Sequence, residues 1–166
     1  MTSSPHRELS HVDKDSHARM VNVSDKAVTH RTAVAEAWVQ VGPEIAACVK
    51  RTGGVKKGPV LSTAEIGGIL GAKQTPHLIP MCHPLLLNDI QVHAELVENR
   101  IRIVAEVTSD GKTGVEMEAM TACSVAALTV YDMVKSAGKG IEIGPIRLLE
   151  KQGGKSGSWT RSEVTV

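Results

Sequence analysis

The residues most able to do chemistry are charged side chains at the two ends of one apolar stretch, residues 113–135. Glu116 and Glu118 stand near its start, and Asp132 and Lys135 stand near its end. On a helix, three-residue spacing puts Asp132 and Lys135 on one face, where a carboxylate and an ammonium group can share a proton. The alternative is a solvated surface pair. We favour a functional pair, because apolar residues flank Asp132 and an acid in the last turn opposes the helix dipole.

This stretch is expected to form one long and largely buried helix. It follows the turn signal Asp110-Gly111, ends before Gly138, and is rich in Ala, Met and Leu. Along a helix, the step from Glu118 to Asp132 covers about 21 Å, too far for one small ligand to bridge. Either the Glu-Met-Glu segment is not helical, or a second chain completes the pocket. We favour the second chain.

A stiff apolar segment, residues 78–87, presents Cys82 and His83 between two prolines, Pro80 and Pro84. The prolines exclude a regular helix and disfavour a central strand. We interpret His83 as a hydrogen-bonding or proton-transfer group. Adjacent Cys and His rarely bind one ion, and no further ligand motif is visible, so no metal is expected. The sequence gives no sign of a cofactor or of a role for Mg²⁺.

Cations are spread along a chain whose net charge is only +1. Any one of them alone is typical of a solvated surface. As a convergent set they would suit a polyanion such as a nucleoside triphosphate or pyrophosphate. The members of this set are Lys26, Arg31, Lys57, Lys73, Lys135, Lys151 and Lys155. The Gly154-Lys155-Ser156 tripeptide is not a P-loop, because Leu149 stands where that motif requires glycine.

Composition indicates a globular protein with a substantial core. Hydrophobic residues make up 42% and charged residues 22% of the 166 positions, as in a single soluble domain. An aromatic fraction of 2% without Phe disfavours single-stranded nucleic acid as a partner and requires an aliphatic core. Three isolated cysteines, Cys48, Cys82 and Cys123, predict neither disulfides nor structural zinc. With no signal peptide or membrane-spanning run visible, we expect a cytoplasmic protein without nucleic-acid or membrane partners.

The pattern predicts a disordered leader (1–8), one α+β domain with an N-terminal arm (9–151), and a flexible Gly-rich tail (152–166). The arm covers either a surface or a neighbour, or it is a flexible leader. The elements expected within the domain are a strand over Thr32–Val41, a helix over Glu44–Arg51, a second helix from Ser62 or Thr63 to about Lys73, a hairpin over 89–98 and 100–108, and a strand over Ile141–Leu149.

Two further details refine this expectation of an antiparallel sheet with helices packed on one face. Gly67, Gly68 and Gly71 weaken a helix, so their presence indicates close packing against another backbone. Pro145 places its strand at an edge or makes it irregular, because proline cannot donate a ladder hydrogen bond.

Five sequence motifs, in order along the chain, closely resemble those of one family. The resemblance covers roughly residues 9–159. That family is the molybdenum-cofactor biosynthesis protein C family, the cyclic pyranopterin monophosphate synthases. The motifs are Met20-Val-Asn-Val-Ser-Asp-Lys26, Leu78-Ile-Pro-Met-Cys-His-Pro84, Thr113-Gly-Val-Glu-Met-Glu-Ala119, Ala127-Leu-Thr-Val-Tyr-Asp-Met133 and Glu150-Lys-Gln-Gly-Gly-Lys-Ser-Gly157.

The resemblance implies a ferredoxin-like α+β fold, dimers that assemble into a hexamer, and sites at subunit interfaces. It implies a lyase that converts 3′,8-cyclo-7,8-dihydroguanosine 5′-triphosphate to cyclic pyranopterin monophosphate and releases pyrophosphate. By motif, Asp132 matches the catalytic aspartate, Lys135 its partner and Lys57 the catalytic lysine. The positions assigned to substrate binding, to which we add Glu116 and Lys73, are Met81, Cys82, His83, Glu116, Met117, Glu118, Lys26, Arg31 and Lys73.

Two positions depart from the pattern of the family. Asn22 and Pro59 stand where aspartate is usual, and Pro59 stiffens the loop that carries Lys57. Of the roles that the resemblance implies, the role of Lys57 therefore depends most on how this loop is folded. The alternative function is a non-catalytic oligomer that binds a nucleotide or a partner protein. An inactive homologue would be expected to lack Asp132 or Lys135, and both are present.

Overall fold

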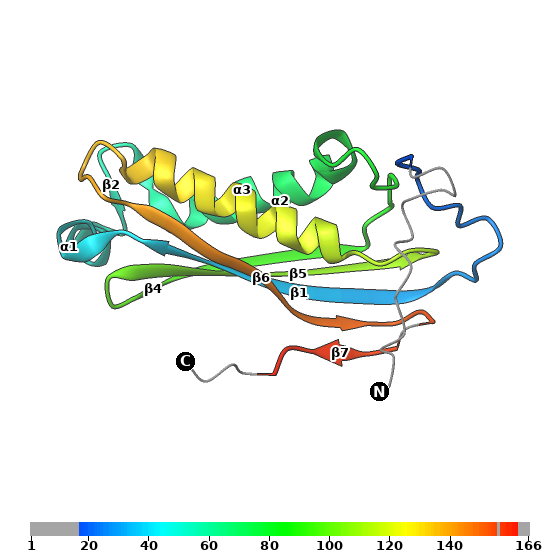
Figure 1. Ribbon diagram of the computed structural model, residues 1–166. Helices are drawn as coiled ribbons and strands as arrows, with labels where there is room; N and C mark the ends of the chain where they lie inside the picture. The colour runs from blue at the N-terminus through cyan, green and yellow to red at the C-terminus, as the bar shows by residue number, and fades with distance from the viewer. Residues whose placement is uncertain (1–16, 156, 163–166) are drawn as a thin grey trace, which may run out of the picture.

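The computed structural model describes residues 17–155 and 157–162, arranged as a sheet with helices on one face (Figure 1). The predicted leader, residues 1–8, lies outside the described residues. The elements in chain order are β1 (Thr29–Gln40), α1 (Gly42–Thr52), β2 (Gly54–Val55), β3 (Gly58–Pro59), α2 (Val60–Leu78), β4 (Asp89–Val97), β5 (Arg100–Gly111), α3 (Glu116–Val134), β6 (Glu142–Gln152) and β7 (Trp159–Thr160).

The main sheet has the order β4-β5-β1-β6-β7, and every neighbouring pair is antiparallel. Without the short elements, the chain runs β1, α2, β4, β5, α3, β6, which is the β-α-β-β-α-β succession of ferredoxin-like folds. The predicted fold class is therefore confirmed. Helix α1 and the β2–β3 hairpin form an insertion between β1 and α2, at one end of the sheet (Figure 1).

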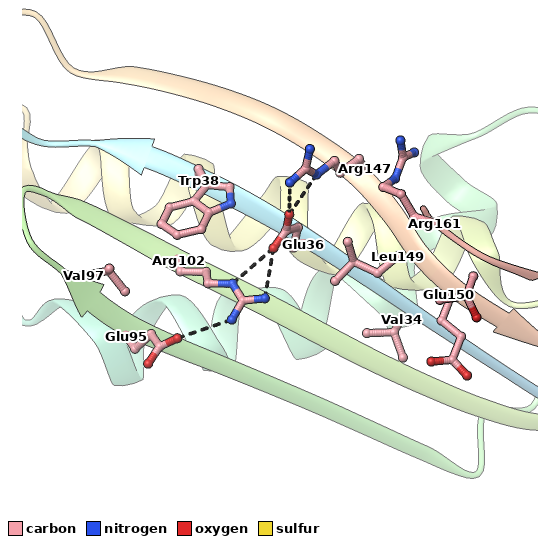
Figure 2. Close-up of a pocket in the computed structure, with 11 residues that line it drawn as sticks. Val34, Glu36, Trp38, Glu95, Val97, Arg102, Arg147, Leu149, Glu150 and Arg161 are labelled. Carbon is pink, nitrogen blue, oxygen red and sulfur yellow. Dashed lines mark hydrogen bonds and ion pairs between the residues drawn. The ribbon is translucent and has the colours of Figure 1, made fainter. Parts of the chain in front are cut away.

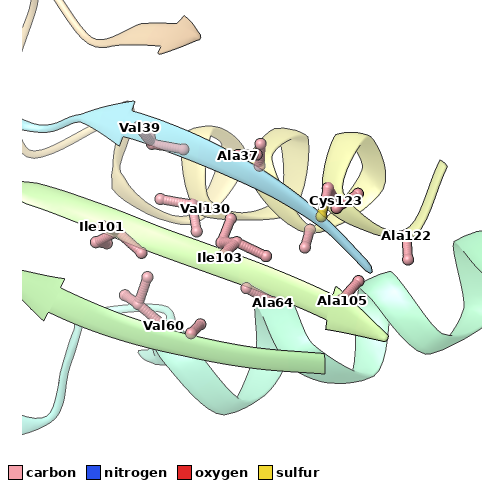
Figure 3. Close-up of a cluster of buried hydrophobic side chains, with 14 of the residues drawn as sticks. Ala37, Val39, Val60, Ala64, Ile101, Ile103, Ala105, Ala122, Cys123 and Val130 are labelled. Carbon is pink, nitrogen blue, oxygen red and sulfur yellow. The ribbon is translucent and has the colours of Figure 1, made fainter. Parts of the chain in front are cut away.

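The core lies between this sheet and helices α2 and α3 (Figure 3). Alternating residues of β1 turn alanines inward, and β5 places larger side chains opposite two of them: Ala33 pairs with Val107 and Ala37 with Ile103. Large against small fills the layer without aromatic side chains, as the composition predicted. Helix α3 adds Cys123 to this layer, fully buried beside the sheet.

The predicted close packing of the α2 glycines is confirmed. A Cβ atom added at Gly67 would lie 2.6 Å from Oγ1 of Thr129, and one at Gly71 would lie 2.7 Å from Cβ of Val125. Both neighbours belong to α3, and Gly68 faces Val92 of β4 in the same way. The glycines therefore bring α2 against α3 and fix where α3 lies on the sheet.

The predicted limits of α2 were wrong at both ends. The helix begins at Val60 with Pro59 as its N-cap, and neither Ser62 nor Thr63 supplies a capping side chain. Instead, Oγ1 of Thr63 donates a hydrogen bond back to the Pro59 carbonyl at 2.5 Å. At the other end, the helix continues past Lys73 and through Pro76 to Leu78. Burial of Ala72 and Thr75 in the last turns outweighs the hydrogen bond that proline cannot make.

The irregular strand predicted around Pro145 is also confirmed. Strand β6 shifts register against β1 twice, and its other side pairs with β7 only at Glu150 and Lys151. Pro145 therefore lies where β6 forms the edge of the described sheet, so its missing N–H group costs no ladder bond on that side.

Candidate functional site

At the C-terminal end of α3, the carboxylate of Asp132 lies between two ammonium groups. Lys135 Nζ is 2.7 Å from one carboxylate oxygen, and Lys57 Nζ is 3.0 Å from the other. Lys57 also donates to the Asp132 carbonyl at 2.6 Å. Lys57 stands in the turn between β2 and β3, directly before Gly58. The insertion between β1 and α2 therefore carries Lys57 to the end of α3, and Pro59 does not prevent this.

These three residues form an open and ionised cluster. Hydrogen bonds from Lys135 and then Lys57 lower the pKa of the Asp132 carboxyl to about 2, and the same pairing raises the pKa of Lys135. The Asp132 side chain is 59% exposed. At neutral pH Asp132 is therefore an anion that holds two cations, and a ligand can reach all three groups from solvent.

At the N-terminal end of α3, a cavity of about 240 Å³ collects most of the predicted substrate-binding residues. The segment after α2 contributes Met81, Cys82 and His83, and the first turn of α3 contributes Glu116, Met117 and Glu118. From the N-terminal arm, Val21, Val23 and Lys26 also line this cavity. We call it the Glu118 pocket.

Glu118 has the opposite environment to that of Asp132. Its side chain is almost fully buried, with 3% of its surface exposed. Burial, and secondarily the negative charge of Glu116, raises the pKa of Glu118 to about 7. Burial and the nearby Glu118 charge also raise the pKa of the Cys82 thiol, which makes it a poor nucleophile. A carboxyl group that titrates near neutrality is well suited to proton transfer.

A second cavity of about 430 Å³ adjoins the Glu118 pocket and is strongly basic. The two cavities share Lys26, Thr113, Gly114 and Glu116, so they are lobes of one larger site. We call the second one the basic cavity. Its cationic lining residues are Lys26, Arg31, Lys112, Lys151 and Lys155. Such a cluster of ammonium and guanidinium donors is the arrangement that binds phosphates.

Among the cations of the basic cavity, Lys112 did not stand out in the sequence. Its Nζ donates to the Ser24 carbonyl at 2.6 Å, so it holds the arm beside the cavity. Its signal was its place directly after Asp110-Gly111. The predicted turn at these two residues was wrong, because both pair with β1 as the last residues of β5. Lys151 is paired with Glu116 at 2.9 Å, at the boundary between the two cavities.

The seven predicted cations do not all meet within one chain. Lys26, Arg31, Lys151 and Lys155 line the basic cavity, whereas Lys57 and Lys135 hold Asp132 at the other end of α3. Lys73 is exposed on α2 and lines neither the basic cavity nor the Glu118 pocket.

A third cavity, about 840 Å³, lies on the sheet face away from the helices (Figure 2). There Glu36 of β1 accepts hydrogen bonds from Arg102 Nε at 3.1 Å and Arg147 Nε at 2.8 Å. Burial alone raises the pKa of Glu36, but the hydrogen bonds from Arg147 and Arg102 outweigh it and the net pKa is lowered. Because both guanidinium groups are engaged, we interpret this cluster as a link across three strands.

Two kinds of feature are absent from the part of the chain that the structure describes. No group of three or more His, Cys, Asp or Glu side chains there is placed to hold a metal ion. No helix within residues 17–155 and 157–162 is long and apolar enough to cross a membrane.

Comparison with known proteins identifies the family. The MoaC family matches residues 20–154. The chain belongs to the MoaC family. A relative from Streptomyces coelicolor, named cyclic pyranopterin monophosphate synthase, is 51% identical over 158 residues, covering 95% of this chain and 92% of the relative. Another of the same name, from a Methylobacterium species, is 56% identical over 153 residues, covering 91% and 95%. The match to the MoaC family spans both ends of α3 and every residue that lines the two cavities except Lys155.

Proposed function

We propose that this chain is a cyclic pyranopterin monophosphate synthase acting in molybdenum cofactor biosynthesis. It would convert 3′,8-cyclo-7,8-dihydroguanosine 5′-triphosphate to cyclic pyranopterin monophosphate and pyrophosphate. Similarity to relatives of that name over more than nine-tenths of the chain supports this assignment. The observation that carries it is the Lys57–Asp132–Lys135 cluster, which retains the charged groups expected of the catalytic centre. The cytoplasmic location expected from the sequence stays a prediction.

The two lobes at the start of α3 suit the two halves of this substrate. The basic cavity would hold the triphosphate, because five cationic side chains line it. The Glu118 pocket would hold the purine-derived ring, where His83 and Glu118 offer hydrogen-bonding and proton-transfer groups. We expect these cationic side chains to neutralise the phosphate charge without a metal ion. Activity should therefore survive treatment with a chelator.

In this proposal Asp132 sets the positions of two ammonium groups. A carboxyl group with a pKa of about 2 is a weak base at neutral pH, so Asp132 alone is poorly suited to remove a proton. Its two partners, Lys57 and Lys135, are cations that can stabilise developing negative charge. The cluster would supply these groups as the purine ring opens and the pterin ring closes.

One chain cannot bring its two halves of the site together. Helix α3 runs without a break from Glu116 to Val134, so Glu118 and Asp132 are about 21 Å apart along it. We therefore propose that a second copy completes each site and that closed two-fold symmetry creates two equal sites per dimer. The family resemblance implies that such dimers assemble into a hexamer.

Exposed apolar side chains on α2 and α3 are consistent with contact between copies. Ile66 and Leu70 of α2 are 61% and 57% exposed, and Leu128 and Tyr131 of α3 are 60% and 40% exposed. Tyr131 directly precedes Asp132 on α3 and Leu128 lies one turn before it, so an interface that covers them would bring a second chain to the cluster.

A subunit-mixing experiment tests the shared site. Glu118→Ala and Asp132→Asn are each expected to be inactive, and mixing them with subunit exchange should restore activity. A mixed dimer would hold one site that carries both changes and one site that carries neither.

The matched control mixes Asp132→Asn with Lys135→Ala, which both damage the same half of the site. Every site of that mixed dimer would keep one change, so activity should stay absent. Mass-tagged subunits would verify exchange in both mixtures. Verified exchange without recovery in the first mixture would refute the shared site. Failure of the unmodified protein to form product from the cyclic dihydro-GTP would instead favour a non-catalytic binding module.

A further inference from the structure

The guanidinium group of Arg31 lies against the backbone of a glycine in the basic cavity. Arg31 belongs to β1, and the chain leaves β6 at Gln152, which pairs with Thr32 of β1. Gly153 and Gly154 follow, so they lie directly beside Arg31 and line or adjoin the same cavity. On its other side, Arg31 Nε donates to the carbonyl of Gly111 at 3.4 Å.

A side chain at position 154 would occupy the place of the guanidinium group. A Cβ atom built there would overlap Arg31 Nη1, and it would lie 2.5 Å from Cζ and 2.8 Å from Nη2. The bare backbone of Gly154 therefore forms one wall of the space in which the guanidinium group lies. Its planar fork of donors binds phosphate in a bidentate geometry, so the orientation of the guanidinium group decides which contacts it can make.

Gly154 has a second reason to be glycine, which must be separated from the first. Its φ of +73° is a conformation that other residues adopt only with strain. Gly157 provides the separation. It has a φ of +66°, and no atom of residues 17–155 or 157–162 lies within 4 Å of a Cβ added there. Its N–H donates to the Gly154 carbonyl at 3.1 Å. Alanine at 157 would keep that N–H.

We propose that Gly154 is a positioning residue for phosphate recognition, fixing the Arg31 guanidinium group so that it faces the basic cavity. This inference rests on the proposed function, in which that cavity holds the triphosphate. Lys26, Lys112, Lys151 and Lys155 are flexible point charges, whereas Arg31 supplies a directional fork whose aim depends on the shape of the surrounding backbone.

The test measures binding of inorganic pyrophosphate by calorimetry to the full-length protein and four variants. They are Arg31→Ala, Gly154→Ala, Gly157→Ala and the double variant Arg31→Ala with Gly154→Ala. Loss of a charge-assisted hydrogen bond lowers affinity on the order of tenfold or more. Arg31→Ala and Gly154→Ala should each show this loss, and Gly157→Ala should bind within about twofold of the unmodified protein. In the double variant, Gly154→Ala should add little to the loss of affinity, because the guanidinium group that it would displace is already absent.

Melting temperatures of the same proteins keep the test informative if Gly154→Ala folds poorly. Removing Arg31 gives the new Cβ room, so the double variant should melt at a higher temperature than Gly154→Ala alone. Additive losses in affinity, an equal loss in Gly157→Ala, or no recovery of the melting temperature would each overturn the positioning role. Arg31→Ala that binds pyrophosphate normally would refute the role of Arg31, and with it the inference, whereas no binding by the unmodified protein would refute the phosphate site itself. Loss in Arg31→Ala with normal binding by Gly154→Ala would refute only the inference about Gly154.

Discussion

The two ends of helix α3 place the same kind of group in opposite surroundings. Glu118 is buried beside Glu116, and its pKa is raised to about 7. Asp132 is open to solvent between Lys135 and Lys57, and its pKa is lowered to about 2. Two carboxyl groups on one helix therefore differ by about 5 pKa units, although their intrinsic values lie close together.

The surroundings of each carboxyl group, buried or paired with lysines, determine its chemical role. At neutral pH Glu118 is near its midpoint and can gain or lose a proton with little cost, whereas Asp132 stays charged and holds its cations in place. Divergent pKa values within one site are typical of acid–base catalysis. If the two ends meet across an interface, one site gains both a titrating acid and a fixed ion cluster.

The largest expected effect comes from removing the charge at the exposed end. Asp132→Asn should lower turnover at least about 10³-fold, because both ammonium groups lose the anion that positions them. The free energy of unfolding should change little, since the pair is exposed to solvent. Steady-state assays and denaturant unfolding would measure the two quantities.

A matched control for that variant is Glu44→Gln, which neutralises an exposed carboxylate in the first turn of α1. It should keep both turnover and stability near those of the unmodified protein. Near-normal turnover in Asp132→Asn would mean that the cluster is only structural, and the contrast between the two ends would then have no catalytic meaning.

An intermediate effect is expected at the buried end, as a pH dependence of stability. The pKa of Glu118 rises from 4.5 unfolded to about 7 folded, so the folded state binds the extra proton between those values. Stability should therefore fall as the pH rises from 4.5 to 7 and level off above, by at most about 3 kcal/mol. Glu118→Gln should remove this slope and be the more stable protein above pH 7.

Urea unfolding across pH 4.5–8.5, at one protein concentration, would measure this slope. Fixed concentration matters because an oligomer gains stability by mass action. Glu116→Gln serves as the partner variant: it removes the neighbouring charge but leaves the burial of Glu118, so it should reduce the slope without abolishing it. An unchanged slope in Glu118→Gln would show that Glu118 is ionised and solvated in the folded protein.

Much of this arrangement could be predicted from the sequence, and the exceptions have physical reasons. The long helix, the hairpin before it and the role of Gly67, Gly68 and Gly71 follow from periodicity and from the cost of glycine in helices. The end of α2 did not follow, because local rules place a helix end before Pro76 and tertiary burial of Thr75 outweighs them.

The cations show the same division between local and tertiary information. Spacing alone placed Lys135 beside Asp132, because three helical residues fix that distance. It could not place Lys57, which reaches Asp132 across 75 residues, or divide the remaining cations between two ends of α3. The sequence did not single out Lys112, because its role depends on its contact with the N-terminal arm. Contacts between residues far apart in the sequence could be placed only from the folded structure.

The smallest expected effect sharpens the comparison at the exposed end, through the pKa of Asp132 itself. Hydrogen bonds from Lys135 and then Lys57 lower this pKa from 3.8 to about 2, so Lys135→Ala should raise it and Lys57→Ala should raise it by less. The sign for stability follows: the folded value is lowered, so the contribution of Asp132 is present above pH 3.8 and lost as the pH falls towards 2. Carbon-13 NMR titration of the side-chain carboxyl groups would follow Asp132 directly, with Lys50→Ala, a cation in the last turn of α1, as the control that should leave it unchanged. An Asp132 pKa near 3.8 in the unmodified protein would mean that the lysines do not hold it in solution, and the two ends of α3 would then differ only through the burial of Glu118.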